Sequence, residues 1–299
     1  ALTEGSSNTA FGRAALGAHT TASNNTALGN HAGLGVTTGA TNVLVGSLVG
    51  SAGTMTGDNN VVMGYQAGKN MSSAHSNVIL GENAGRNIGT GNNLVLIGRN
   101  AGDTLSTANH SIFIGPEAGD GHDTETNNIG IGSNALGGPV AGGEFNVAIG
   151  NYALDALTSA DKNVAIGYNA GSGITSGGGN TLVGNEAGND ITSGTFNTFF
   201  GFEAGDGFDG ESHNLGIGSD ALGGPIAGGE YNVAVGNYTL DALTSADNNT
   251  AVGYQAGSAH TTGANCVFIG RQAGLANTTG ASIVAIGANA YDQADTESH

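Results

Sequence analysis

Two short acidic segments of the chain have the residue types of a calcium site. Each holds three carboxylates within six residues, and the second segment lies 86 residues after the first. Carboxylate oxygens are ligands that Ca²⁺ prefers, and the glycines inside the segments allow the chain to bend around an ion. The spacing matches neither an EF-hand nor a calcium-binding roll, and solvated surface charge is the alternative. The candidate metal ligands are Asp120, Asp123, Glu125, Asp206, Asp209 and Glu211.

Other reactive residues of the sequence favour structural roles. A second duplicated loop carries Asp155 and Asp161, then Asp241 and Asp247, and is interpreted as a polar cap over buried leucines. The eight histidines have no metal-ligand spacing. No nucleophile elbow, phosphate-binding loop or CxxC motif occurs, and the paired carboxylates in an aromatic groove that a polysaccharide-degrading solenoid needs are absent. The chain is therefore predicted not to be an enzyme, and no cofactor is required apart from the possible Ca²⁺.

All these residues are carried by a short repeat that runs through the whole chain. Its clearest copies are Asn-Val-Ala-Ile-Gly at residues 146–150 and 163–167. Successive closing glycines, from Gly12 to Gly287, are 17 residues apart thirteen times and 18 residues apart three times. So strict a period predicts an all-β parallel β-roll or β-solenoid of about 17 coils. We expect each coil to contain two short strands joined by two turns.

The strand of each repeat is apolar on both faces. Counted from the closing glycine as position 0, position −3 is Val, Ile, Leu or Thr in every repeat, and position −1 is always apolar. Position −2 is apolar as well, which predicts one face inside the coil and the other covered by a partner. We assign position −2 to a subunit interface. Its members include Leu96, Phe113, Leu182, Phe199 and Phe268.

Several positions of the repeat are expected to shape the coil. The closing glycine suits a corner with positive φ, and the frequent alanine at +3 suits a narrow inward site. Position −4 is asparagine in thirteen of seventeen repeats, and stacked asparagines can hydrogen-bond along a column. Cys266 occupies this same position, so a structural role is predicted for the single cysteine.

A longer repeat is superimposed on the short one. Residues 115–171 match residues 201–257 at 42 of 57 positions, an offset of 86 residues or five coils. The three 18-residue repeats end at Gly64, Gly150 and Gly236, which are again 86 residues apart. We predict a single β-solenoid domain over residues 1–299, built from duplicated five-coil blocks, with a short polar tail at residues 292–299.

Composition excludes several classes of partner. The 56 glycines, three prolines and absence of tryptophan in 299 residues are typical of a turn-dense β-architecture with a thin core. A net charge of −18 with only six Lys and Arg excludes binding to nucleic acid or to anionic membranes. The longest apolar stretches are about five residues, so no direct membrane insertion is expected.

The phrase Asn-x-Ala-apolar-Gly-x-x-Ala, clearest at Asn146 and Asn163, resembles the head repeat of trimeric autotransporter adhesins, the YadA-like left-handed β-roll. Resembling repeats extend from Asn8 to Ala290. Residues 249–257 are also similar to repeats of phage tail fibres and uncharacterised surface proteins. The resemblance implies a homotrimer packed through one sheet face, located outside the cell, at a cell surface or in a virion fibre. The repeat is longer here than is usual in that family, and its neck, stalk and membrane barrel have no counterpart in this sequence.

Two functions are predicted. The first is a non-enzymatic extracellular fibre module, a rigid trimer that displays loops for attachment to a host-surface or matrix ligand. The second is a structural subunit that polymerises end to end into a filament through its exposed solenoid ends. Electron microscopy would separate short rods from unlimited filaments.

Overall fold

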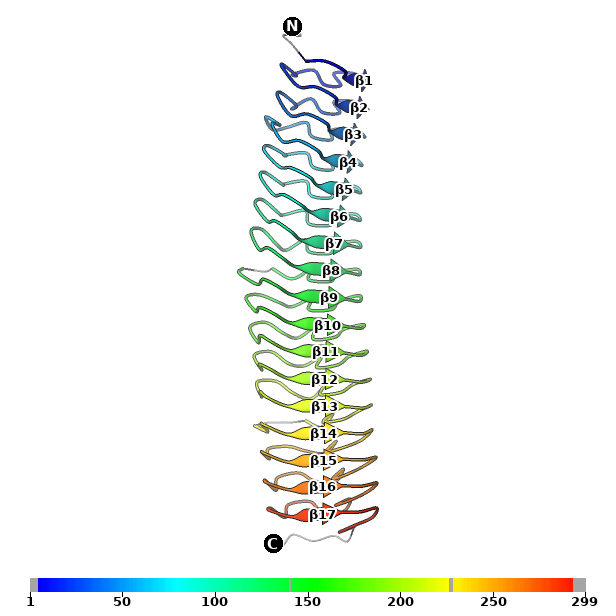
Figure 1. The fold of residues 1–299 in the computed structure, drawn as a ribbon, viewed down its shortest axis with the longest axis vertical. Coiled ribbons are helices and arrows are strands. Elements are labelled where there is room, and N and C mark those ends of the chain that lie inside the picture. Colours follow the sequence, from blue (N-terminus) through cyan, green and yellow to red (C-terminus); the bar gives the residue numbers. More distant parts are fainter. Residues whose placement is uncertain (1–4, 140, 226–227, 293–299) are drawn as a thin grey trace. The chain divides into compact units, whose positions relative to one another are not determined.

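The computed structural model describes residues 5–139, 141–225 and 228–292, and it divides into two compact units, residues 1–146 and 147–299. Each unit is a parallel β-solenoid in which every 17- or 18-residue coil contributes one strand of three residues (Figure 1). The predicted fold class is therefore confirmed. The single domain stays a prediction, and the polar tail after Asp292 lies outside the described residues.

The strands of each unit stack in chain order and in register. The first unit contains β1 (Thr9–Phe11), β2 (Thr26–Leu28), β3 (Val43–Val45), β4 (Val61–Met63), β5 (Val78–Leu80), β6 (Val95–Ile97), β7 (Ile112–Ile114) and β8 (Ile129–Ile131). The second contains β9 (Val147–Ile149), β10 (Val164–Ile166), β11 (Thr181–Val183), β12 (Thr198–Phe200), β13 (Leu215–Ile217), β14 (Val233–Val235), β15 (Thr250–Val252), β16 (Val267–Ile269) and β17 (Val284–Ile286). Each strand pairs position for position with the next, so like residues form columns.

The middle residue of each strand points into the coil, which makes the interface assigned to position −2 wrong. The side chains of Leu96, Phe113, Leu182, Phe199 and Phe268 are fully buried in the core. Positions −3 and −1 face outward instead, as at Phe200, which is 55% exposed. A three-residue strand can turn one side chain inward and two outward, because side chains alternate between the faces of a sheet. The prediction that both faces of the strand are apolar is therefore correct. The face assigned to the interface lies inside the coil, however, and the face assigned to the core lies outside.

Core volume is shared between positions −2 and +4 of the same coil. Where position −2 is a large residue, as at Phe199, position +4 is glycine, and a Cβ added to Gly205 would lie 2.3 Å from the Phe199 ring. Where position −2 is alanine, as at Ala148 or Ala234, the residue at +4 is often a leucine, buried at Leu154 and Leu240. In these coils the two positions fill one space, as close packing requires. Where both are small, as at Ala165 and Gly171, side chains of neighbouring coils such as Leu182 occupy it.

The side of the coil opposite the strand is built from turns, so the predicted second strand is absent from the described residues apart from two isolated bridges. Positions −5, +2 and +4 of every repeat have left-handed backbone, with φ of about 50–75°. These residues bend the chain on either side of the strand. Neighbouring coils are still joined here by backbone hydrogen bonds, for example from Thr158 N to Thr175 O at 3.0 Å.

A column of buried asparagines at position −4 joins the coils through their interior. The Oδ1 atom of Asn163 accepts a hydrogen bond from the backbone N of Asn180 in the next coil at 2.9 Å. Its Nδ2 atom donates across the coil to Gly177 O, also at 2.9 Å. Cys266 continues this column: its backbone N donates to Asn249 Oδ1 at 2.9 Å, and its thiol donates to Gly280 O at 3.3 Å. The predicted ladder and the structural role of Cys266 are both confirmed.

The shared space of positions −2 and +4 can be tested by a double-mutant cycle. We expect Phe199→Ala to lower the free energy of unfolding by about 3–5 kcal/mol, because it leaves a cavity. Gly205→Leu alone should also destabilise, since the Phe199 ring occupies the space of its side chain. Together the two changes should restore part of the loss, because Leu154 and Leu240 adopt the same left-handed backbone beside alanine. Urea unfolding measures all four proteins, and strictly additive effects would contradict the shared space.

Candidate functional site

The most extensive candidate surface is the outer sheet face, defined here as the side chains at positions −3 and −1 of the strands. Its exposed apolar members are Phe11, Leu28, Val43, Val61 and Met63 in the first unit, and Ile166, Phe200, Ile217, Val252, Ile269, Val284 and Ile286 in the second. Exposed rings at position +1 adjoin it, among them Tyr168 and Phe202. The described strands contain no charged residue, and position −3 is threonine in five of them, so this face forms an uncharged, mostly apolar stripe along each unit.

Such a stripe is unusual for a surface in contact with water. Monomeric soluble proteins rarely expose large contiguous apolar patches, and those that exist generally mark contacts with other molecules. Elsewhere the chain has a net charge of −18. The contrast between an uncharged face and an acidic remainder makes this face the main candidate for association. Sequence reasoning placed the interface on position −2 and missed this face.

In the acidic loops, the two glutamates hydrogen-bond to the backbone. Glu125 is buried, and its Oε2 accepts from the backbone N of Asp123 at 2.9 Å while Oε1 accepts from Gly142 N at 2.9 Å. Glu211 does the same, accepting from Asp209 N at 2.9 Å and Gly228 N at 2.7 Å. Burial raises the pKa of Glu125, but these hydrogen bonds outweigh it and leave the pKa below its ordinary value. Each glutamate therefore fastens its loop to the following coil.

Two aspartates of these loops accept hydrogen bonds from hydroxyl groups. Asp123 accepts a hydrogen bond from the hydroxyl of Ser106, and Asp209 accepts one from Thr192, each in the preceding coil. Within residues 5–139, 141–225 and 228–292, no group of three or more His, Cys, Asp or Glu side chains is arranged to hold a metal ion. Calcium binding by these loops stays a prediction.

Two aspartates at position +5 carry a buried oxygen. The Oδ1 atoms of Asp206 and Asp241 have no hydrogen-bond partner among the described residues. Burial, together with the nearby carboxylates of Glu203, Asp220 and Asp190, raises the pKa of Asp206 to about 6. Burial likewise raises the pKa of Asp241 to about 6. Both side chains are only partly enclosed, and their environment favours the protonated form.

The remaining sequence candidates belong to the core and its covering loops. Leu157 and Leu243 are fully buried beneath the second duplicated loop, as predicted, and Asp247 in that loop accepts a hydrogen bond from Glu230 N at 2.9 Å. His122 is buried, its ring centroid 5.0 Å from that of Phe113. Its counterpart Phe208 lies in the same way 4.9 Å from Phe199. His122 therefore occupies an aromatic core position.

Comparisons with models of known protein families, with curated proteins and with solved structures gave no significant match to this chain. No helix among the described residues is long and apolar enough to cross a membrane. The main candidate site of the described residues is the outer sheet face.

The pKa values of Asp206 and Asp241 predict a dependence of stability on pH. Because each folded pKa lies above the ordinary value of 3.8, the two carboxyls stabilise the fold fully below pH 3.8, and this contribution is lost as pH rises through about 6. Asp206→Asn and Asp241→Asn should therefore stabilise the protein at pH 7.5 by about 1 kcal/mol each, after allowance for solvent screening. At pH 3.5 they should have little effect. Thermal unfolding at both pH values measures this, with Asp292→Asn at an exposed site as the control.

His122→Phe should stabilise the protein. Neither ring nitrogen of His122 has a partner of ordinary hydrogen-bond geometry among the described residues. Burial lowers its pKa to about 4, although Glu125 and the backbone of Leu136 favour the charged form. The histidine therefore costs stability that increases as pH falls from 6.5 towards 4. Replacing it should raise the free energy of unfolding by about 1–3 kcal/mol, more at pH 5 than at pH 8. The reverse change in the duplicate coil, Phe208→His, should destabilise, and a neutral result for both would contradict this account.

Proposed function

We propose that this chain is a non-enzymatic structural module of an extracellular fibre, in which three copies associate through the outer sheet face. The observation that carries the proposal is the uncharged apolar stripe at positions −3 and −1. Association through this face would remove its exposed apolar side chains from water, and apolar burial is the main favourable term in stable association.

A second copy of the same chain is the partner that fits this face best. The stripe repeats at the spacing of parallel strands, about 4.8 Å per coil, and only another solenoid of the same period presents apolar residues at matching intervals. The strands contain no acidic residues, so copies that approach through this face bring no carboxylates together. Closed assemblies of identical chains are the usual form of such association.

The resemblance of the repeat to heads of trimeric autotransporter adhesins supports the choice of three copies and a location outside the cell or at its surface. It also supports a role in attachment to a host-surface or matrix ligand. The turns opposite the strand vary in sequence from coil to coil while the core columns are kept. Variable loops on a constant scaffold are typical of repeat proteins that bind other molecules.

The assembly can be tested by placing charge on the outer sheet face. Ile166→Lys, Phe200→Lys and Val252→Lys together should convert a trimer to monomers, because three lysines per chain would meet in the interface. Multi-angle light scattering measures the mass. A matched control is Ser193→Lys, Ser245→Lys and Thr262→Lys, which places the same charges at exposed position +9, on the turns opposite the strand. The control should remain trimeric.

A monodisperse monomer for the unmodified chain would contradict the proposal, and so would a trimer that withstands the three lysines on the outer face. Electron micrographs provide a second measurement. Filaments much longer than one chain would instead support polymerisation end to end through the free edges of the terminal strands.

A further inference from the structure

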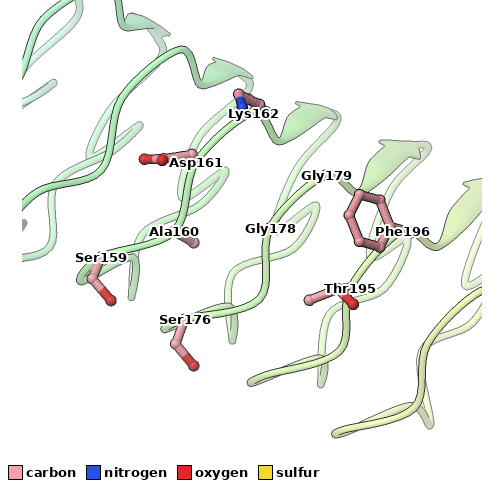
Figure 2. Close-up of a pocket in the computed structure, with 9 residues that line it drawn as sticks. All are labelled: Ser159, Ala160, Asp161, Lys162, Ser176, Gly178, Gly179, Thr195 and Phe196. Carbon is pink, nitrogen blue, oxygen red and sulfur yellow. The ribbon is translucent and has the colours of Figure 1, made fainter.

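Exposed rings flank the outer sheet face at both ends of its strands. The side chains at position −5, just before each strand, form the entry edge, and those at positions +1 and +2, just after the closing glycine, form the exit edge. On the entry edge of the second unit, Phe196 is 61% exposed and Tyr231 54% exposed. On its exit edge, Phe202 is 51% exposed and Tyr238 40% exposed. Figure 2 shows Phe196 where the chain enters β12.

Contacts between coils hold these rings in place. On the entry edge, Phe196, His213 and Tyr231 form a stack in successive coils, with ring centroids 5.4 and 5.0 Å apart and planes inclined by 16° and 3°. On the exit edge, the rings of Tyr238 and Tyr254 meet at 89°, with centroids 6.1 Å apart. Both edges therefore present ordered apolar surface to the outside.

Folding of one chain does not explain the rings at these positions. Phe196, Tyr231 and Tyr238 have left-handed backbone, with φ of 57°, 59° and 57°. That conformation is unfavourable for bulky residues, and most repeats have asparagine, serine or threonine at position −5. The rings remain largely exposed, so little burial offsets the strain. Contact with another molecule would supply that burial.

The two edges vary together along the sequence. Only three repeats have Phe or Tyr at position −5, and all three belong to the six repeats that have Phe or Tyr at +1 or +2. The three combinations are Phe145 with Tyr152, Phe196 with Phe202 and Tyr231 with Tyr238. In the second unit, β12 lies between Phe196 and Phe202, and its three residues span about 10 Å. The matching of the edges therefore does not serve a contact within one copy.

Polar residues of the two edges are matched in the same way. Only two repeats have histidine at position −5, and both have a carboxylate at +2, although only four of the seventeen repeats do. The two combinations are His110 with Glu117 and His213 with Asp220. A histidine ring donates hydrogen bonds to a carboxylate. The two edges of one coil are thus complementary in both their apolar and their polar residues.

A closed ring of copies explains why two edges of the same coil should match. When chains are related by rotation about an axis parallel to the solenoid, each contact joins two different edges. The rotation also keeps every coil at the height of its counterparts. The entry edge of one copy then meets the exit edge of its neighbour in the same coil.

We propose that the entry edge of one copy packs against the exit edge of the next, coil by coil, on the border of the outer sheet face. The contact rests on the proposed function, because it requires copies that associate through that face. Exposed aromatic residues are enriched at such contacts. In the second unit the contacts between neighbouring copies are Phe196 to Phe202, His213 to Asp220 and Tyr231 to Tyr238.

Cysteine cross-linking tests which edges meet. Phe196→Cys and Phe202→Cys in one chain place a thiol on each edge of the same coil, and both positions are serine in other repeats, so the fold should be kept. A short bismaleimide should join these chains into covalent trimers, seen on denaturing gels. Each single variant should give no covalent trimer, and neither should the unmodified chain, whose Cys266 is buried.

Phe196→Cys with Tyr254→Cys is the matched control. Its exit-edge thiol lies three coils further on, about 14 Å along the solenoid, so covalent trimers should be at least tenfold fewer. Multi-angle light scattering before cross-linking separates this contact from the proposed function. If the chain is a trimer and the control pair reacts equally well, or neither pair reacts, the edge contact is overturned and the association of copies stands. A monomer overturns both.

A charge reversal tests the polar contact. His213→Glu should set two carboxylates against each other and raise the concentration of half-dissociation at least tenfold, as measured by sedimentation over a dilution series. Adding Asp220→Lys should restore the trimer, because a lysine then meets the new glutamate. Adding Gln255→Lys instead, at the same position two coils further on, should not restore it. Equal dissociation of the two double variants would overturn the pairing of His213 with Asp220.

Discussion

Direct contact between the backbones of successive coils at the closing glycines is the constraint on which each unit depends. A Cβ added at these positions, from Gly12 to Gly270, would lie 2.0–2.6 Å from the backbone of the next closing glycine wherever the contact is described. The φ values there, between 128° and 152°, are open only to glycine. Because each coil rests on the next at this corner, every other position of the repeat is stacked in register.

Each stacked column stabilises the thin core in its own way. The asparagine at position −4 hydrogen-bonds to backbone groups inside the coil, and it is fully buried at Asn163 and Asn180. An unpaired polar group in that environment would be costly, so the ladder succeeds because each amide meets a partner in its own coil and one in the next. Leu94, Ser111, Cys266 and Ile283 replace asparagine in this column. Ser111 still accepts a hydrogen bond from Asn128 N at 3.2 Å, so the connection continues at this position.

Features that follow from the repeat period were predicted from the sequence, but the side of the strand that faces the core was not. Seventeen-residue spacing was sufficient for the solenoid, the glycine corner and the asparagine ladder, because each follows from identical residues falling into columns. The inward side of the strand was assigned wrongly, since both faces are apolar. One signal was available: five strands have threonine at position −3, for example Thr181 and Thr250, whereas position −2 is never polar. The acidic loops show the same limit, because spacing alone does not reveal that Glu125 and Glu211 bind backbone amides.

The way in which a coil is filled also determines where other molecules can bind. Interior space is taken by positions −4, −2, +3 and +4, and strand geometry forces positions −3 and −1 outward. These outward residues remain β-branched or apolar because strands favour them, so one face of each unit is uncharged and mostly apolar, with threonine at position −3 in five strands. Position −5 is under neither restriction: its left-handed backbone accommodates Ser7, Asn24, Lys162, Phe196 and Gly179 alike. A column that the core does not constrain is free to vary, and in the second unit it carries the stacked rings of Phe196, His213 and Tyr231.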